Sequence, residues 1–213
     1  MDIVLFGKPG AGKGTQAPRL AAALGVPTVA TGDVLRAAVR EGTTRGLEAK
    51  SYMDRGDLVP DEVILAILKE ALATDAFARG AIYDGVVRTT PQAEGFERVL
   101  GDIGRKLDAV LMFDIPDDEI VRRLSDRTVC DTCQTPYTGI EPGTPCAKPG
   151  CGGKLVRRKD VDPAAVRNRL EVYRRQTEPV LRWYQDHGAK VATIDAVGSV
   201  DEVTARALRA LGQ

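Results

Sequence analysis

Histidine, aromatic residues and net charge are scarce in this sequence, and each scarcity excludes a kind of function. The 213 residues include one histidine, His187, near the end of a long helical pattern. No serine–histidine–aspartate catalytic triad is therefore available, and we assign His187 no role. Thirty Lys and Arg residues balance 30 Asp and Glu residues, which leaves no charge excess for wrapping nucleic acid. Because no exposed stretch interleaves basic and aromatic residues either, we expect no nucleic-acid partner.

Long apolar runs are also missing. No run approaches the roughly 18 residues that a membrane-spanning helix needs. The opening MDIVLFGKPGAGKGT has an acid at position 2 and only a short apolar run, which is typical of a buried strand leading into a loop rather than a signal peptide. We therefore expect a cytoplasmic protein without a membrane partner. Apolar residues make up 43% and charged residues 28%, as in a globular protein with one core and small inserted subdomains.

Short apolar runs alternate with longer segments of helical spacing. The strand candidates are mostly not alternating, as expected for a parallel sheet buried on both faces; they are Ile3–Phe6, Pro27–Ala30, Ala81–Tyr83, Ala109–Phe113 and Lys190–Ile194. The helix candidates are Gly14–Leu24, Asp61–Ala76, Thr90–Leu100, Asp117–Ser125, Pro163–Asp186 and Asp201–Leu211. This order predicts an α/β fold with helices on both sides of the sheet.

Two stretches interrupt the alternation. Residues 31–60 carry two short helical segments without a strand candidate, and residues 127–157 are rich in Gly, Pro, Thr and Cys with few large apolar side chains. The second stretch has too little apolar content for a core of its own without a metal. We interpret both as insertions over the sheet edge that act as lids.

A phosphate-binding loop is predicted directly after the first strand. The sequence from Gly7 reads Gly-Lys-Pro-Gly-Ala-Gly-Lys and then opens a helix, which is the context that the G-x-x-x-x-G-K motif requires. Backbone N–H groups, the helix N-terminus and the Lys13 ammonium together suit a triphosphate. The next residue is Gly14, with the hydroxyl one place later at Thr15. We therefore do not assume the magnesium arrangement of the common GTPases.

All four cysteines fall within a segment of 22 residues, in the pattern Cys130-x2-Cys133 and Cys146-x4-Cys151. Two close pairs of thiolates suit tetrahedral zinc, and four protein ligands leave no position for a reacting water. We predict a structural zinc site; disulfides and free thiols are the alternatives.

In several segments along its length, the chain resembles the adenylate kinases of the nucleoside monophosphate kinase family. The matching segments, in family order, are GKPGAGKGTQ from Gly7, TGDVLR at Thr31–Arg36, MDRGDLVPDE at Met53–Glu62, DGVVRTTPQAE at Asp84–Glu94 and RRLSDR at Arg122–Arg127. Arg158 and Arg169, with Tyr173 following, match the late arginine motif of the family.

The resemblance implies a P-loop NTPase-like three-layer fold with a five-stranded parallel sheet. It implies a core of residues 1–30, 61–122 and 161–213, a helical AMP-binding domain at 31–60, and a zinc-ribbon-like lid at 123–160. The implied reaction is ATP + AMP ⇌ 2 ADP with magnesium, in a monomer.

The resemblance also assigns individual residues. The residues for ATP are Gly10, Ala11, Gly12, Lys13, Gly14, Thr15, Arg123, Arg127, Tyr137 and Gly198. Those for AMP are Thr31, Arg36, Val59, Gly85, Arg88, Gln92, Arg158 and Arg169. The residues expected to act on the transferring phosphoryl group are Lys13, Arg88, Arg123, Arg158 and Arg169, since ammonium and guanidinium groups neutralise phosphate charge.

Base recognition and magnesium binding are read from residue chemistry. Gln92 both donates to and accepts from an adenine edge. Asp33 and Asp84 are short carboxylates near element ends and are predicted to hold waters around magnesium; helix capping and turn roles are the alternatives.

The chain departs from the family in the fourth motif, where Val86-Val87 replaces the usual Phe-Pro. We predict weaker AMP binding from this exchange. Alternative functions are another monophosphate kinase, GTP:AMP or UMP/CMP, and, in a different class, a nucleotide-binding protein with a non-catalytic zinc-ribbon interaction module.

Overall fold

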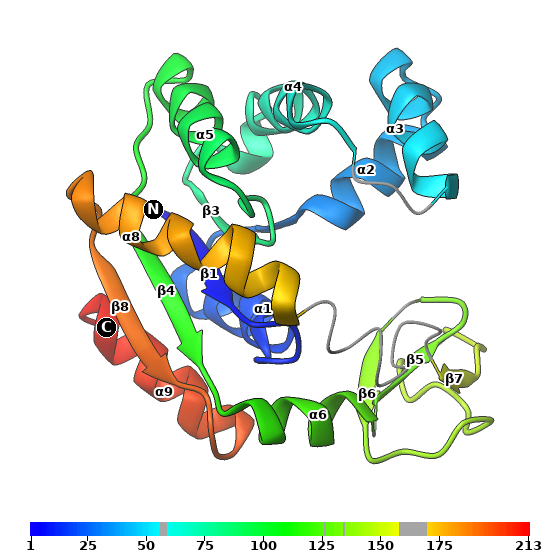
Figure 1. The fold of residues 1–213 in the computed structure, drawn as a ribbon. Coiled ribbons are helices and arrows are strands. Elements are labelled where there is room, and N and C mark those ends of the chain that lie inside the picture. The colour runs from blue at the N-terminus through cyan, green and yellow to red at the C-terminus, as the bar shows by residue number, and fades with distance from the viewer. Residues whose placement is uncertain (56–58, 126, 134, 158–169) are drawn as a thin grey trace.

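The computed structural model describes residues 1–55, 59–125, 127–133, 135–157 and 170–213. Within these residues the centre of the molecule is a five-stranded sheet in the order β2-β3-β1-β4-β8, with every pair parallel (Figure 1). The strands are β1 (Asp2–Gly7), β2 (Thr28–Ala30), β3 (Ala81–Asp84), β4 (Ala109–Asp114) and β8 (Val191–Asp195). The predicted five-stranded parallel sheet is confirmed.

Both faces of the sheet are buried, because successive side chains of a strand point to opposite faces. In β1, Ile3 and Leu5 belong to one apolar cluster, whereas Val4 and Phe6 belong to the other. The helices α1 (Lys13–Leu24) and α9 (Val200–Leu211) cover the first face; α4 (Asp61–Leu72), α5 (Thr90–Asp102) and α8 (Glu178–Asp186) cover the second. Each fully buried Leu, Ile or Phe contributes about 1.5–3 kcal/mol, so these three layers supply the main stability.

Two helices fill the first interruption of the sequence pattern. They are α2 (Thr31–Arg40), which starts where β2 ends, and α3 (Thr44–Arg55). Leu35, Ala38 and Ala49 join the same buried cluster as α4, so this insertion is packed against the core. The short η1 (Asp75–Phe77) then leads into β3.

The second interruption forms a small sheet of its own. Helix α6 (Asp117–Ser125) leads away from β4, and beyond it lies an antiparallel sheet in the order β6-β5-β7, at a distance from the large sheet (Figure 1). Its strands are β5 (Arg127–Cys130), β6 (Pro136–Thr138) and β7 (Leu155–Arg157). Val129 and Leu155 are its buried aliphatic side chains among the described residues, which is too little apolar surface for a conventional core.

The helix predicted over Pro163–Asp186 is not one regular helix in its described part. The chain is helical before Tyr173, passes through the π-helical turn η3 (Tyr173–Thr177) and continues as α8. Pro179 lies in the first turn of α8 and has no N–H for the preceding turn, which accounts for the wider turn at this position. Residues 163–169 lie outside the described part.

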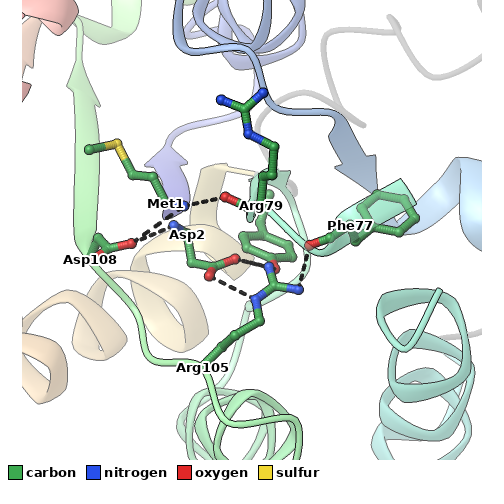
Figure 2. A network of polar contacts seen from close by, with 7 residues as sticks. Met1, Asp2, Phe77, Arg79, Arg105 and Asp108 are labelled. Carbon is green, nitrogen blue, oxygen red and sulfur yellow. Dashed lines mark hydrogen bonds and ion pairs between the residues drawn. The ribbon is translucent and has the colours of Figure 1, made fainter. Parts of the chain in front are cut away.

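At the amino end of the sheet, an ion pair between the buried Asp2 and the partly buried Arg105 joins β1 to the loop before β4 (Figure 2). The Asp2 carboxylate accepts from Arg105 Nε at 3.0 Å and from the Tyr83 hydroxyl at 2.6 Å. Arg105 also donates to the Phe77 carbonyl at 2.8 Å. Burial raises the pKa of Tyr83, and Asp2 is only 3% exposed. Every charged group of this network therefore has a partner, as buried charges require.

Within the described part of the chain, no helix is both long enough and apolar enough to cross a bilayer.

Candidate functional site

The segments that carry the predicted phosphate loop, Thr31 and Gly85 lie at the carboxyl end of the large sheet. Asp84, the last residue of β3, is in register with Leu5 of β1 and with Ala30 of β2, so these three strands end side by side. The phosphate loop follows β1, Thr31 follows β2 and Gly85 follows β3. β1 lies between β3 and β4, which is the point where the strand order reverses and where open α/β sheets bind ligands.

The loop after β1 has the backbone of a phosphate cradle. Gly7, Gly10 and Gly12 have φ values of 144°, 89° and 94°, which favour glycine and let successive N–H groups turn to one side. Gly12 is the N-cap of α1, so the positive end of that helix faces the loop. Lys13 Nζ lies 2.6 Å from the Gly7 carbonyl and 3.0 Å from the Lys8 carbonyl, with its ammonium over the loop.

The rest of the loop is anchored to its surroundings. Lys8 Nζ donates to the Ile115 carbonyl at 3.2 Å and to Asp117 Oδ1 at 2.8 Å. Ala11 is buried, and its N–H donates to the Lys8 carbonyl at 3.1 Å. The Thr15 N–H donates to the Gly12 carbonyl at 2.9 Å, in the first turn of α1. The cradle is therefore held in shape by its own backbone and by α6.

Gly14 is explained by its neighbour. A Cβ at this position would lie 3.3 Å from Asp84 Oδ2. The small residue therefore lets the Asp84 carboxylate approach the start of α1, beside Lys13. A serine or threonine here, as in the commoner motif, would force the carboxylate to move. Gly14 is thus compatible with this close approach, and a carboxylate next to a phosphate loop can hold waters around a cation.

Four of the predicted AMP residues form a second group near the ends of β2 and β3. The buried Thr31 hydroxyl donates to the Gly85 carbonyl at 2.9 Å. Arg88 is exposed, and its guanidinium comes close to Gly85. A Cβ atom added to Gly85 would lie 3.6 Å from a terminal nitrogen of Arg88. The Arg88 backbone N–H donates to Gln92 Oε1 at 2.7 Å. These four residues therefore lie together.

Three valines of the segments matched to AMP binding are buried near this second group. Val59 is buried, and so are Val86 and Val87, in the cluster that also contains α4 and α5. The exchange of Phe-Pro for Val-Val therefore keeps two apolar side chains inside the core. Its effect on AMP binding stays a prediction.

On the other side of β1, Arg123 of α6 lies beside the loop that follows β8. Its Nε donates to Glu119 Oε1 at 2.8 Å, and one terminal nitrogen donates to the Ala196 carbonyl at 3.0 Å. Gly198 lies two residues further along the same loop, with φ 115°. Arg123 also approaches Gly12, because a Cβ atom added to Gly12 would lie 3.9 Å from a terminal nitrogen of Arg123. Arg123, Gly198 and the cradle therefore lie together.

Several predicted residues are not described in full. Arg158 and Arg169 lie outside the described residues. The side chains of Asp33, Arg36 and Arg127 are likewise outside what the structure describes. The backbone shows that Ala30 is the N-cap of α2, so Asp33, two residues inside that helix, is not the N-cap. Their assigned roles stay predictions.

The four cysteines form one cluster in the small sheet. Their Sγ atoms lie within 4.8 Å of one another; Cys130 to Cys151 is 3.5 Å and Cys133 to Cys146 is 3.6 Å. Zinc–sulfur bonds of about 2.3 Å place tetrahedral sulfurs about 3.8 Å apart, so these residues fit that metal. None of the four is in a disulfide.

Donors surround the sulfurs, as a thiolate site requires. The Cys133 N–H points to Cys130 Sγ at 3.4 Å, and the Lys148 N–H points to Cys146 Sγ at 3.4 Å. The Thr135 hydroxyl and N–H lower the pKa of Cys133 to about 6. The Tyr137 hydroxyl lies 3.1 Å from Cys146 Sγ. Tyr137, which the resemblance assigns to ATP, thus contacts the cysteine cluster; its role toward ATP stays a prediction.

Sequence reasoning assigned no role to Asp61, which hydrogen-bonds Gln92, or to Lys8 and Glu119, which fix the cradle and Arg123. Asp61 follows Pro60 at a helix start, and this placement indicates only a favourable helix end. The partners of all three are set by the tertiary fold.

Known proteins match the chain over nearly its whole length. The family model described as adenylate kinase matches residues 5–189. An adenylate kinase of Gemmatimonas aurantiaca is 61% identical over 211 residues, covering 99% of each chain. One from Methanocella arvoryzae is 46% identical over 208 residues, covering 96% of this chain and 95% of its own. One from Streptomyces griseus is 46% identical over 214 residues, covering 99% and 97%.

The family match covers most of the chain, and the phosphate cradle, the acidic strand end and the cysteine cluster occur where the motifs predict them. This chain belongs to the adenylate kinase family.

Proposed function

We propose that the protein catalyses the reversible transfer of the γ-phosphoryl group of ATP to AMP, with magnesium, giving two ADP. A phosphate oxygen of AMP forms the new bond to phosphorus, and the bond from phosphorus to the β-phosphate oxygen of ATP breaks. The observation that carries the proposal is the meeting of two groups of residues at one sheet edge, the cradle of β1 and the Thr31–Gly85–Arg88–Gln92 group.

Each group has a chemistry that suits one nucleotide. The cradle N–H groups and Lys13 neutralise and orient the ATP phosphates, and Arg123 with Gly198 borders them on the β8 side. Arg88 binds the AMP phosphate, for which its planar fork is suited. Gln92 meets the adenine edge, with Thr31 and Val59 beside it. Arg36, Arg127, Arg158 and Arg169 complete the positive charge around the phosphates in this proposal.

Asp84, with Asp33, would hold magnesium through water; the ion supplies charge neutralisation to the transferring phosphoryl group when bound. Asp84 is supported by its position against Gly14 at the start of the cradle. The four cysteines would hold zinc in a structural role, since they would fill all four coordination positions of the metal. We further propose a division into a core, an AMP-binding segment at 31–60 and a lid at 123–160, in a cytoplasmic monomer.

The test is ADP formation from a panel of donors (ATP, GTP) and acceptors (AMP, UMP, CMP), with and without magnesium. We expect the ATP–AMP pair with magnesium to give the highest kcat/KM. A folded, zinc-loaded preparation that is inert toward every pair would overturn the proposal, and a higher kcat/KM with UMP or CMP would reassign the acceptor.

A further inference from the structure

The side chain of Asp61, at the start of α4, accepts a hydrogen bond from the side-chain amide of Gln92 in α5. Asp61 is the first residue of α4, and its Oδ1 accepts from Gln92 Nε2 at 2.6 Å. The other end of the amide, Oε1, accepts from the Arg88 N–H at 2.7 Å. The Thr89 hydroxyl lies 3.5 Å from Asp61 Oδ2 and also receives the Gln92 N–H at 3.3 Å. Gln92 is therefore fixed at both ends.

These partners allow only one orientation of the amide. An ionised carboxylate only accepts hydrogen bonds, and a backbone N–H only donates them. Turning the amide over would place Oε1 against the carboxylate and the NH2 group against the N–H. Gln92 is 7% exposed, so water has little access to relieve either contact. Buried polar groups that lose their partners are costly, and the turned amide is excluded.

One N–H and one lone pair of the amide are left for a ligand. A base that pairs with them must present an amino group toward Oε1 and a ring acceptor toward Nε2. Adenine, with its 6-amino group and N1, presents this pattern. Hypoxanthine and guanine present the opposite one, an oxygen at C6 and an N–H at N1. Since Gln92 cannot turn over, it rejects them.

We propose that Asp61 is a positioning residue that fixes the amide of Gln92 and thereby selects a 6-aminopurine over a 6-oxopurine at the acceptor site. The inference rests on the proposed function, in which Gln92 meets the acceptor base. Because Gln92 also holds the Arg88 backbone, the same contact orients the phosphate-binding arginine relative to the base.

The experiment compares AMP with inosine monophosphate as acceptors of phosphate from ATP. The two bases have the same shape and differ in hydrogen-bond polarity at C6 and N1. The wild-type protein should prefer AMP strongly. Asp61→Asn carries an amide that presents either polarity, so the AMP-to-IMP ratio of kcat/KM should fall on the order of tenfold. The KM for AMP should change more than kcat.

A matched control is Glu62→Gln, which removes the same charge from the same first turn of α4 at an exposed position. The AMP-to-IMP ratio of kcat/KM of this variant should equal that of the wild type. In a Gln92→Leu background, Asp61→Asn should leave the ratio unchanged, because the group it positions is gone. Should Asp61→Asn fail to fold, Asp61→Ser replaces it, since a hydroxyl also donates and accepts.

An Asp61 variant that keeps the wild-type ratio overturns the inference, as does a wild-type protein that uses IMP as readily as AMP. Both results leave the proposed function standing. A wild-type protein that phosphorylates neither acceptor contradicts the proposed function itself.

Discussion

The two ends of the large sheet handle charge in opposite ways. At the amino end, the buried Asp2 and Tyr83 and the partly buried Arg105 hydrogen-bond to one another (Figure 2). At the carboxyl end, Lys13 lies over a loop of glycines with positive φ, and Arg88 is exposed. The first end uses charge to stabilise the fold, and the second keeps charge accessible to a ligand.

This contrast has a consequence for mutations. Removing charge at the amino end leaves a buried partner unsatisfied, so it should lower stability and spare activity. Removing charge at the carboxyl end removes a group that we propose to bind substrate, so it should lower activity and spare stability.

The largest effect is expected at Lys13. Lys13→Ala should lower kcat for ADP formation on the order of 10³-fold, because the ammonium that we propose to neutralise the ATP phosphates is lost. The free energy of unfolding should change by less than about 1 kcal/mol, measured by urea denaturation. Lys106→Ala, an exposed lysine near the amino end, is the control and should change neither. Equal loss of activity in both variants would remove the contrast.

The complementary change is Arg105→Leu. It leaves the buried Asp2 carboxylate without its guanidinium partner, which should cost about 3–5 kcal/mol. At 25 °C the KM values for ATP and for AMP should stay near those of the wild type. Arg98→Leu, at an exposed position of α5, should cost less than about 1 kcal/mol. An Arg105 variant as stable as wild type would show that the network is dispensable.

Removal of a metal ion from the cysteine cluster should affect the small antiparallel sheet and leave both ends of the large sheet unchanged. The amides of Cys130, Cys146 and Leu155 are hydrogen-bonded within the small sheet, which has few buried apolar side chains. Chelation should speed their hydrogen exchange by at least about 10²-fold, because the proposed zinc ion would supply most of the local stability. Amides of β1 and β4 should keep their rates. Unchanged exchange in the small sheet after chelation would contradict a structural role for zinc.

A smaller effect is expected at Gly14. Gly14→Ala places a Cβ 3.3 Å from Asp84 Oδ2, so the carboxylate must shift by a few tenths of an ångström. We expect kcat/KM to fall roughly tenfold, since small misplacements in this chemistry are costly. Gly101→Ala, in a helix and with nothing within 4 Å of the new Cβ, should leave kcat/KM unchanged. Equal kinetics in the two variants would show that Asp84 needs no such closeness.

The smallest effect concerns pH. The hydrogen bond from Lys8, and then Arg174, lowers the pKa of Asp117 in the folded state. Its contribution to stability is therefore present above the unfolded pKa and is lost as pH falls through the folded pKa. The difference in unfolding free energy between wild type and Asp117→Asn should shrink on acidification. A difference that grows or stays constant would contradict the assignment.

Sequence patterns predicted the sheet and the cradle because both follow from local order. The apolar run Ile3–Phe6, the glycines after it and Lys13 are adjacent in the chain. The contact of Asp61 with Gln92 spans 31 residues, and that of Asp2 with Arg105 spans 103. Such pairs depend on how helices and strands pack, and neither side chain carries a local signal for its partner. The π-helical turn before Pro179 likewise escaped the periodic pattern.

The most direct test of the account is the binding of a dinucleotide with two adenosines joined by a chain of phosphates, measured by calorimetry. One molecule should bind per chain, and both Lys13→Ala and Gln92→Leu should weaken its binding if, as we propose, the two groups at the carboxyl end form one site. Binding that responds to neither variant, or no binding by the folded protein, would contradict that claim.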